Sequence, residues 1–196
     1  VKSIIEHYMG SVNGAFITFD LNGDTLKLQD YEANLPNGVK KEYYTASVLK
    51  KITHYKMGLL HGCQTKYSEN GNKQLAISYF EGKKDNVWTY YFDNQEIARI
   101  EVWDKGIKEG SFITYNATGT IINEKYYKKG KPIGIHKEFY LDGREKHTMF
   151  YSKKGVIEEE YAFDDYGVKQ IIKQRETKAM RKKKRKGKEE DNSTMN

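Results

Sequence analysis

The sequence predicts an all-β protein, an elongated single antiparallel β-meander built from about seven hairpin repeats of 24 residues. Three features predict it: a regularly spaced opening glycine, two aromatic positions in every unit, and turn-forming residues between them. The opening residues are Gly14, Gly38, Gly62, Asn86, Gly110 and Gly134. Each lies 24 residues after the one before it, so the period holds over most of the chain.

Every unit carries two aromatic side chains at fixed places. Five residues after the opening residue come Phe19, Tyr43, Tyr67, Tyr91, Tyr115 and Phe139. Seventeen residues after it come Tyr31, Tyr55, Tyr79, Trp103, Tyr127 and Tyr151. A single hairpin is at best marginally stable in water, whereas stacked hairpins cover one another's rings. We therefore expect equivalent rings of successive units to lie beside each other and to hold the array together.

Turn chemistry separates the expected strands. The sequences DLNG at 20–23 and SENG at 68–71 lie between two extended stretches, the second of them often rich in Ile, Leu, Val and Thr. We expect Asn-Gly and Asp-Gly to supply the positive φ values of tight hairpin turns. The stretch 20–24 has a weak similarity to a calcium-binding loop, but its glycine precedes Asp24, and a hairpin turn is the predicted structure.

The chain divides into a partial repeat at 1–13, the repeat array at 14–174 and a basic tail at 175–196. A seventh unit begins near residue 158, because Phe163 and Gly167 keep the spacing. The displacement of Gly155 by one position predicts a bulge or a bend before it. The first residue is Val1, which indicates a removed N-terminal segment and favours export, with a cytoplasmic location as the alternative. No apolar stretch is long enough to predict a transmembrane helix.

The tail holds most of the chain's excess positive charge. Residues 178–191 carry a net charge of +5 out of +7 for the whole chain. This segment is either a solvated, disordered tail or a short helix. Its basic run is a candidate site for an anionic membrane surface or an acidic partner, and it consists of Arg181, Lys182, Lys183, Lys184, Arg185 and Lys186. No aromatic residue interrupts the run, which disfavours nucleic acid.

Motifs for catalysis or metal binding are not found in the sequence. The five histidines occupy unlike places in the repeat, so neither a metal site nor a cofactor is expected. A glycine-rich phosphate loop and a nucleophile elbow are also missing. The one cysteine, Cys63, is expected to be a small buried residue. The sequence therefore predicts a protein that is not an enzyme.

One aromatic cluster exceeds what the repeat requires. Trp88, Tyr90 and Phe92 alternate along the fourth unit, and Phe112 occupies the equivalent of Trp88 in the fifth. Most other units have polar residues at these places, and alternation puts the cluster on the face opposite Tyr91. The cluster is either an exposed partner-binding patch or part of a core that covers both faces. The accessible area of Trp88 distinguishes the two.

The pattern Tyr126-Tyr127-Lys-Lys-Gly130-Lys131-Pro-Ile-Gly134 resembles the MORN repeat. It is most similar to the bacterial variant of that repeat, found in proteins described as antitoxin-like. The resemblance implies an extended β-meander that binds other molecules, associates with itself or contacts anionic lipid. A non-enzymatic protein-interaction module or scaffold is the function expected, with a membrane-surface adaptor acting through the basic tail as the alternative. Open sheet edges are a further route to self-association.

Overall fold

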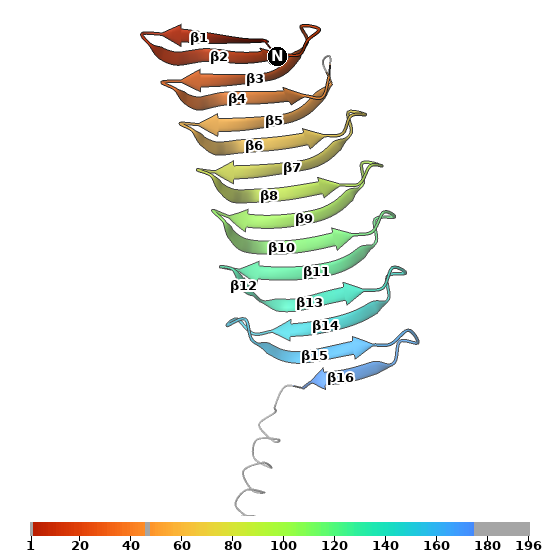
Figure 1. Ribbon diagram of the computed structural model, residues 1–196. Coiled ribbons are helices and arrows are strands. Elements are labelled where there is room, and N and C mark those ends of the chain that lie inside the picture. The colour runs from red at the N-terminus through yellow and green to blue at the C-terminus, as the bar shows by residue number, and fades with distance from the viewer. Residues whose placement is uncertain (1, 46–47, 175–196) are drawn as a thin grey trace, which may run out of the picture.

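The structure, a computed structural model, describes residues 2–45 and 48–174, which form one antiparallel sheet of 16 strands (Figure 1). The strands are β1 Lys2–Tyr8, β2 Ser11–Phe19, β3 Thr25–Glu32, β4 Leu35–Tyr43, β5 Leu49–Lys56, β6 Leu59–Tyr67, β7 Lys73–Phe80, β8 Lys83–Tyr91, β9 Ile97–Asp104, β10 Ile107–Tyr115, β11 Ile121–Lys128, β12 Lys131–Pro132, β13 Gly134–Phe139, β14 Glu145–Tyr151, β15 Ile157–Phe163 and β16 Lys169–Lys173. The predicted meander is confirmed, and β15 and β16 form its seventh hairpin.

The strands follow one another in chain order, each bonded to its sequence neighbours, except that the short β12 pairs only with β11 (Figure 1). The sheet is open and forms a single layer, with β1 at one edge and β16 at the other. Because no second layer covers it, very few side chains are fully buried. The buried hydrophobic residues of the described chain are Ile77 and Trp88. Packing therefore depends on neighbouring side chains of the same face.

The strands are joined by turns of two kinds: short turns lie at one end of the strands and longer turns at the other (Figure 1). Met57-Gly58 is a two-residue turn with φ of 49° and 81°, the conformation that suits the right-handed twist of paired strands. Hairpin turns are present at the expected Asn-Gly and Asp-Gly pairs, and their glycines have positive φ, but these turns are longer than two residues. At Asn70-Gly71 the glycine amide donates to Ser68 O at 3.0 Å in a longer turn, and of that dipeptide only Gly71 has positive φ.

Several of the longer turns are stabilised by the side chain at their first position. Asp20 Oδ1 accepts hydrogen bonds from the backbone amides of Asn22 and Asp24, both at 2.9 Å. This confirms the hairpin turn predicted at 20–24. A polar side chain that bonds its own turn needs no tight left-handed pair, which explains why Asn and Asp are frequent in these longer turns.

The opening residue of each unit marks a backbone irregularity. Gly38 has φ of 96°, and the strand register shifts between Gln29 and Tyr31 on the neighbouring strand. Asn86 takes the glycine's place with φ of 56°, a value that asparagine tolerates better than most residues. Two of these bulges present a backbone amide to a carboxylate of the preceding strand: Ala15 N donates to Glu6 Oε2 and Val39 N donates to Asp30 Oδ2, each at 3.0 Å.

Successive units are also joined through the two-residue turns. Met57 N donates to Asn37 Oδ1 at 3.0 Å, and Lys105 N donates to Asp85 Oδ1 at 3.0 Å, one unit back in each case. The array departs from this pattern before β15, where Ser152 N bonds Val156 O in a longer turn. The displaced Gly155 belongs to that turn. No helix in the described residues is long and apolar enough to cross a membrane.

Candidate functional site

The two faces of the sheet are unlike, and one of them carries a continuous line of rings. We call this line the ring ladder and its side of the sheet the ladder face. The ladder consists of Tyr79, Trp88, Trp103, Phe112, Tyr127, His136 and Tyr151. Adjacent ring centroids are 4.4–6.3 Å apart, the spacing at which tilted and edge-to-face pairs attract.

The ladder differs from the predicted stacking of equivalent rings. Residues 24 apart lie two strands apart, or about 9.5 Å, which is too far for ring contact. The strand between must therefore contribute a ring, as Trp88 does between Tyr79 and Trp103. In the second and third units Lys40 and Gln64 stand at that position, and the ladder is interrupted. The first aromatic of each unit, such as Tyr91, points to the opposite face.

Trp88 is covered within the chain and is not an exposed anchor. Its side chain is 6% exposed, and Nε1 donates to Ser78 O at 2.8 Å. Lys84 Nζ lies 4.3 Å from the ring centroids of both Trp88 and Trp103. At this position the structure thus corrects the expectation of an exposed patch, because side chains of the same face cover the indole; a core on both faces is not formed here, since Val87 on the opposite face is 50% exposed.

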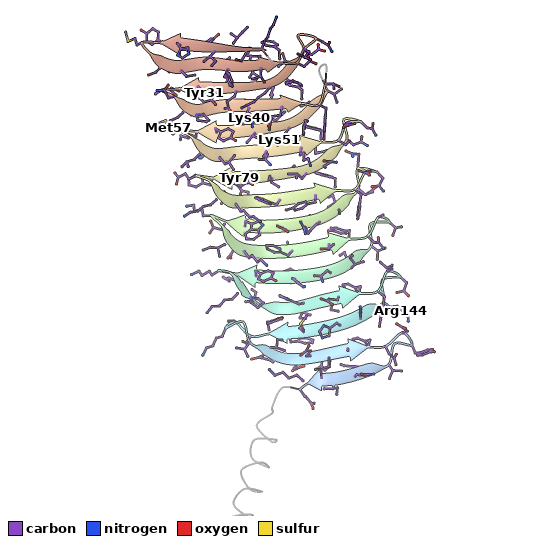
Figure 2. All side chains as sticks on the ribbon, viewed as in Figure 1. Tyr31, Lys40, Lys51, Met57, Tyr79 and Arg144 are labelled. Carbon is purple, nitrogen blue, oxygen red and sulfur yellow. The ribbon has the colours of Figure 1, made fainter. Side chains whose placement is uncertain are left out.

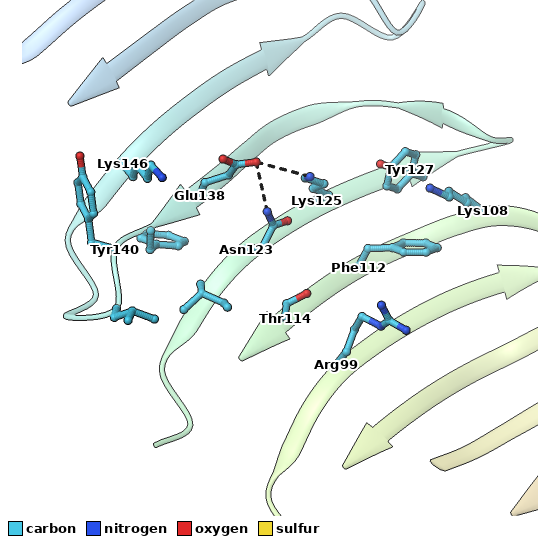
Figure 3. A pocket seen from close by; sticks show the side chains of 13 residues that line it. Arg99, Lys108, Phe112, Thr114, Asn123, Lys125, Tyr127, Glu138, Tyr140 and Lys146 are labelled. Atoms are coloured by element: carbon cyan, nitrogen blue, oxygen red, sulfur yellow. Dashed lines mark hydrogen bonds and ion pairs between the residues drawn. The ribbon is translucent and has the colours of Figure 1, made fainter. Parts of the chain in front are cut away.

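A hollow of about 640 Å³ opens on the ladder face between β9 and the turn after β13 (Figure 3). It is lined by Arg99, Lys108, Phe112, Thr114, Ile122, Asn123, Lys125, Tyr127, Glu138, Phe139, Tyr140, Leu141 and Lys146. A neighbouring hollow of about 490 Å³ shares part of this lining and adds Tyr90 and Phe92. Of the four side chains predicted to bind a partner, Tyr90, Phe92 and Phe112 line these hollows.

The larger hollow is rich in cations. Glu138 is its one carboxylate; its Oε1 lies 3.7 Å from Lys125 Nζ and accepts a hydrogen bond from Asn123 Nδ2 at 3.4 Å (Figure 3). Lys108 Nζ rests over two rings, 4.6 Å from the centroid of Tyr127. The arrangement offers ring surfaces, aliphatic stems and excess positive charge to a ligand.

The guanidinium of Arg99 lies at the boundary of the two hollows. It lies 4.0 Å from the ring centroid of Tyr90, and its Nε is 3.1 Å from Glu101 Oε1. The stacked ring and the ion pair together fix the orientation of the guanidinium, so it is held in place before any ligand arrives.

His136 belongs to the ladder rather than to a polar site. It is 2% exposed, its ring lies between Tyr127 and Tyr151, and Nε2 is 2.8 Å from Tyr126 O. The pKa of His136 is lowered, and burial of the ring is the largest cause. The neutral imidazole is therefore favoured, as its position among rings requires.

Other predicted residues have the following places. Cys63 is exposed on the face opposite the ladder, so its expected burial is wrong; Sγ lies 3.8 Å from Ser78 Oγ. The described residues hold no group of three or more His, Cys, Asp or Glu side chains that could bind a metal ion. The predicted anionic-partner site lies outside the described residues, and its members are Arg181, Lys182, Lys183, Lys184, Arg185 and Lys186.

Sequence reasoning missed the cationic lining of the hollow. Arg99, Asn123 and Lys125 look like ordinary polar positions of the repeat, and only strand register brings them beside Phe112. These residues could have been found by pairing the strands and following the positions that lie on the same face as Trp88 from one strand to the next.

Comparison with known proteins adds no relative: no protein-family model matches the chain, and no curated protein matches it either. The MORN-like character of the repeat accordingly stays a prediction from its sequence pattern.

Proposed function

We propose that this protein is a non-enzymatic interaction scaffold, a MORN-like repeat array whose ladder face binds a protein partner at the two hollows. The observation that carries the proposal is the larger hollow itself, where Phe112, Tyr127 and Tyr140 stand among four cationic side chains on a continuous sheet. Aromatic and arginine side chains, here Phe112, Tyr127, Tyr140 and Arg99, are typical anchors of protein–protein interfaces.

The rigidity of the surface supports binding without large rearrangement. The rings are fixed by their ladder neighbours, and Tyr140 is fixed by a hydrogen bond from its hydroxyl to Phe163 O at 2.8 Å. Side chains that are already ordered lose little entropy on association. An interface of standard size takes about 800 Å² from each partner, an area that several adjacent strands of this sheet supply.

The test uses the full chain as bait in an extract of the cells that make it. The bait variant Leu141→Asp with Lys146→Glu changes the rim of the hollow, where Leu141 is 75% exposed. The matched control is Val87→Asp with Lys41→Glu on the opposite face, where Val87 is 50% exposed. We expect the hollow variant to lose a protein that both the wild type and the control capture.

Circular dichroism of each bait verifies that the sheet is intact. Equal capture by the hollow variant and the wild type contradicts the proposal, and so does a loss confined to the control. Trp88→Ala is unsuitable for this experiment, because the residue is 6% exposed and its removal perturbs the fold.

A further inference from the structure

A second feature of the ladder face lies at β3–β6, on the N-terminal side of the hollows and two strands from Tyr90 at their edge. Four lysines gather there, and we call them the lysine row: Lys27, Lys40, Lys51 and Lys66. Strand pairing places Lys27 opposite Glu42, Glu42 opposite Lys51, and Lys51 opposite Lys66. Lys40 Nζ and Lys51 Nζ lie 2.9 and 3.0 Å from the two carboxylate oxygens of Glu42. Figure 2 shows these two lysines on neighbouring strands.

The row is not explained by the needs of folding. Lys51 and Lys66 stand directly opposite each other, and like charges at such positions destabilise a sheet. Lys66 forms no ion pair with any other residue that the structure describes, and the carboxylate of Glu42 pairs with only two of the four ammonium groups. Thr53, which is paired with Lys40, is 2% exposed and its Oγ1 has no hydrogen-bond partner among the described residues.

The register shows what lies beside the row. Lys66 is opposite Leu75, Leu75 is opposite Tyr90, and Tyr90 is opposite Arg99. At about 4.8 Å per strand, Lys66 and Arg99 are about 14 Å apart across the sheet. In an extended peptide, side chains on the same side are ~6.7 Å apart, so the side chains of residues i and i+4 are separated by about the distance between Lys66 and Arg99.

We propose that the lysine row binds an acidic, extended segment of a protein partner. The segment lies across the strands, with carboxylates on Lys66 and Arg99 and an apolar side chain between them over Leu75 and Tyr90. This inference rests on the proposed function and names the chemistry of the partner. Glu42 shows the binding mode within the chain, since its carboxylate is already held between two ammonium groups.

Two other anionic partners fit the surface less well. Single-stranded nucleic acid needs open ring faces for its bases, whereas the ladder rings face each other and Trp88 is 6% exposed. A membrane surface needs protruding cations. The side chains of Lys40 and Lys51 are only 18% and 33% exposed and lie down on the sheet.

The test is a titration of the full-length, ¹⁵N-labelled protein with the acetylated peptide ESESLSE, followed by amide shifts in nuclear magnetic resonance spectra. We expect shifts in β5, β6 and β9, and an affinity that falls as salt is added. Lys66→Glu is expected to weaken the peptide's binding to these strands by about tenfold, because it turns an attraction into a repulsion. Lys41→Glu makes the same change of charge on the opposite face and is expected to weaken binding less than twofold.

Several results overturn the inference: no shifts in β5 and β6, equal loss with Lys41→Glu, or equal binding of the uncharged peptide QSQSLSQ. Tighter binding of octathymidylate or of phosphatidylserine vesicles to the same amides also overturns it, by assigning the row to nucleic acid or lipid. The titration needs no cellular partner. Its failure is thus distinguishable from failure of the scaffold proposal, which the capture experiment decides.

Discussion

Removing the ring of Trp88 tests whether the ladder holds the sheet together. Trp88 is 6% exposed, and its indole donates a hydrogen bond to Ser78 O. The centroid of its ring lies 5.3 Å from that of Tyr79 and 6.3 Å from that of Trp103. Truncation of a buried tryptophan to alanine costs about 3–5 kcal/mol. This is a large share of the 5–15 kcal/mol that stabilises a typical domain. We therefore expect Trp88→Ala to lower the free energy of unfolding by that amount.

Trp88→Phe separates the ring from its hydrogen bond. It keeps an aromatic side chain in the ladder but leaves Ser78 O without the indole donor, so we expect a smaller loss of about 1–2 kcal/mol. Val87→Ala is the control, since Val87 is the next residue, points to the opposite face and is 50% exposed. It should cost about 0.5 kcal/mol.

The assay is urea unfolding followed by far-ultraviolet circular dichroism. For Trp88→Ala we expect the midpoint to fall by at least about 1 M. Because a repeat array is coupled only through neighbours, we also expect the single transition to separate into two, one for each side of β8. A loss for Trp88→Ala no larger than that for Val87→Ala, with one transition, refutes the ladder as the main stabilising contact.

Three further outcomes are expected. Gly38→Ala should lower the unfolding midpoint more than Gly23→Ala. The two glycines have nearly equal φ, 96° and 94°, so the backbone strain of the substitution is similar. A Cβ at Gly38 would in addition lie 3.1 Å from Asp30 Cβ, whereas a Cβ at Gly23 would have nothing within 4 Å. His136→Phe should make the melting temperature less sensitive to acid. Burial lowers the pKa of His136, so the stability that the neutral ring contributes is complete above about pH 6.5 and is lost as the pH falls. An unchanged pH dependence of the melting temperature contradicts this. Lys66→Glu should leave the melting temperature equal or slightly higher, since it relieves a repulsion, and a clear drop contradicts the account of the lysine row.

The sequence was sufficient to predict the meander because turn residues and rings recur at a fixed period that strand geometry alone explains. It was insufficient for the turn types. The residue pair Asn-Gly suits two conformations, and the choice depends on a side-chain bond such as that of Asp20, which spacing does not show. Burial of Trp88 was also open, because a ring in a single-layer sheet is covered only by neighbours that register brings together.

The site was predictable in part for a related reason. The residues of one unit that point to one face follow from alternation, and this identified Tyr90, Phe92 and Phe112. The hollow needs residues from β9 to the turn after β13, and the cations of its lining come from strands whose positions look unremarkable in isolation. Charge placement across strands thus has to be read from the three-dimensional register.

Site-specific photo-crosslinking tests most directly whether the ladder face is the binding face. Benzoylphenylalanine replaces either Leu141, which lines both hollows, or Val87 on the opposite face, and both positions are well exposed. Irradiation in the cells that make the protein should yield a distinct crosslinked partner from position 141 and none from position 87. The same bands from both positions, or bands from position 87 alone, contradict the account.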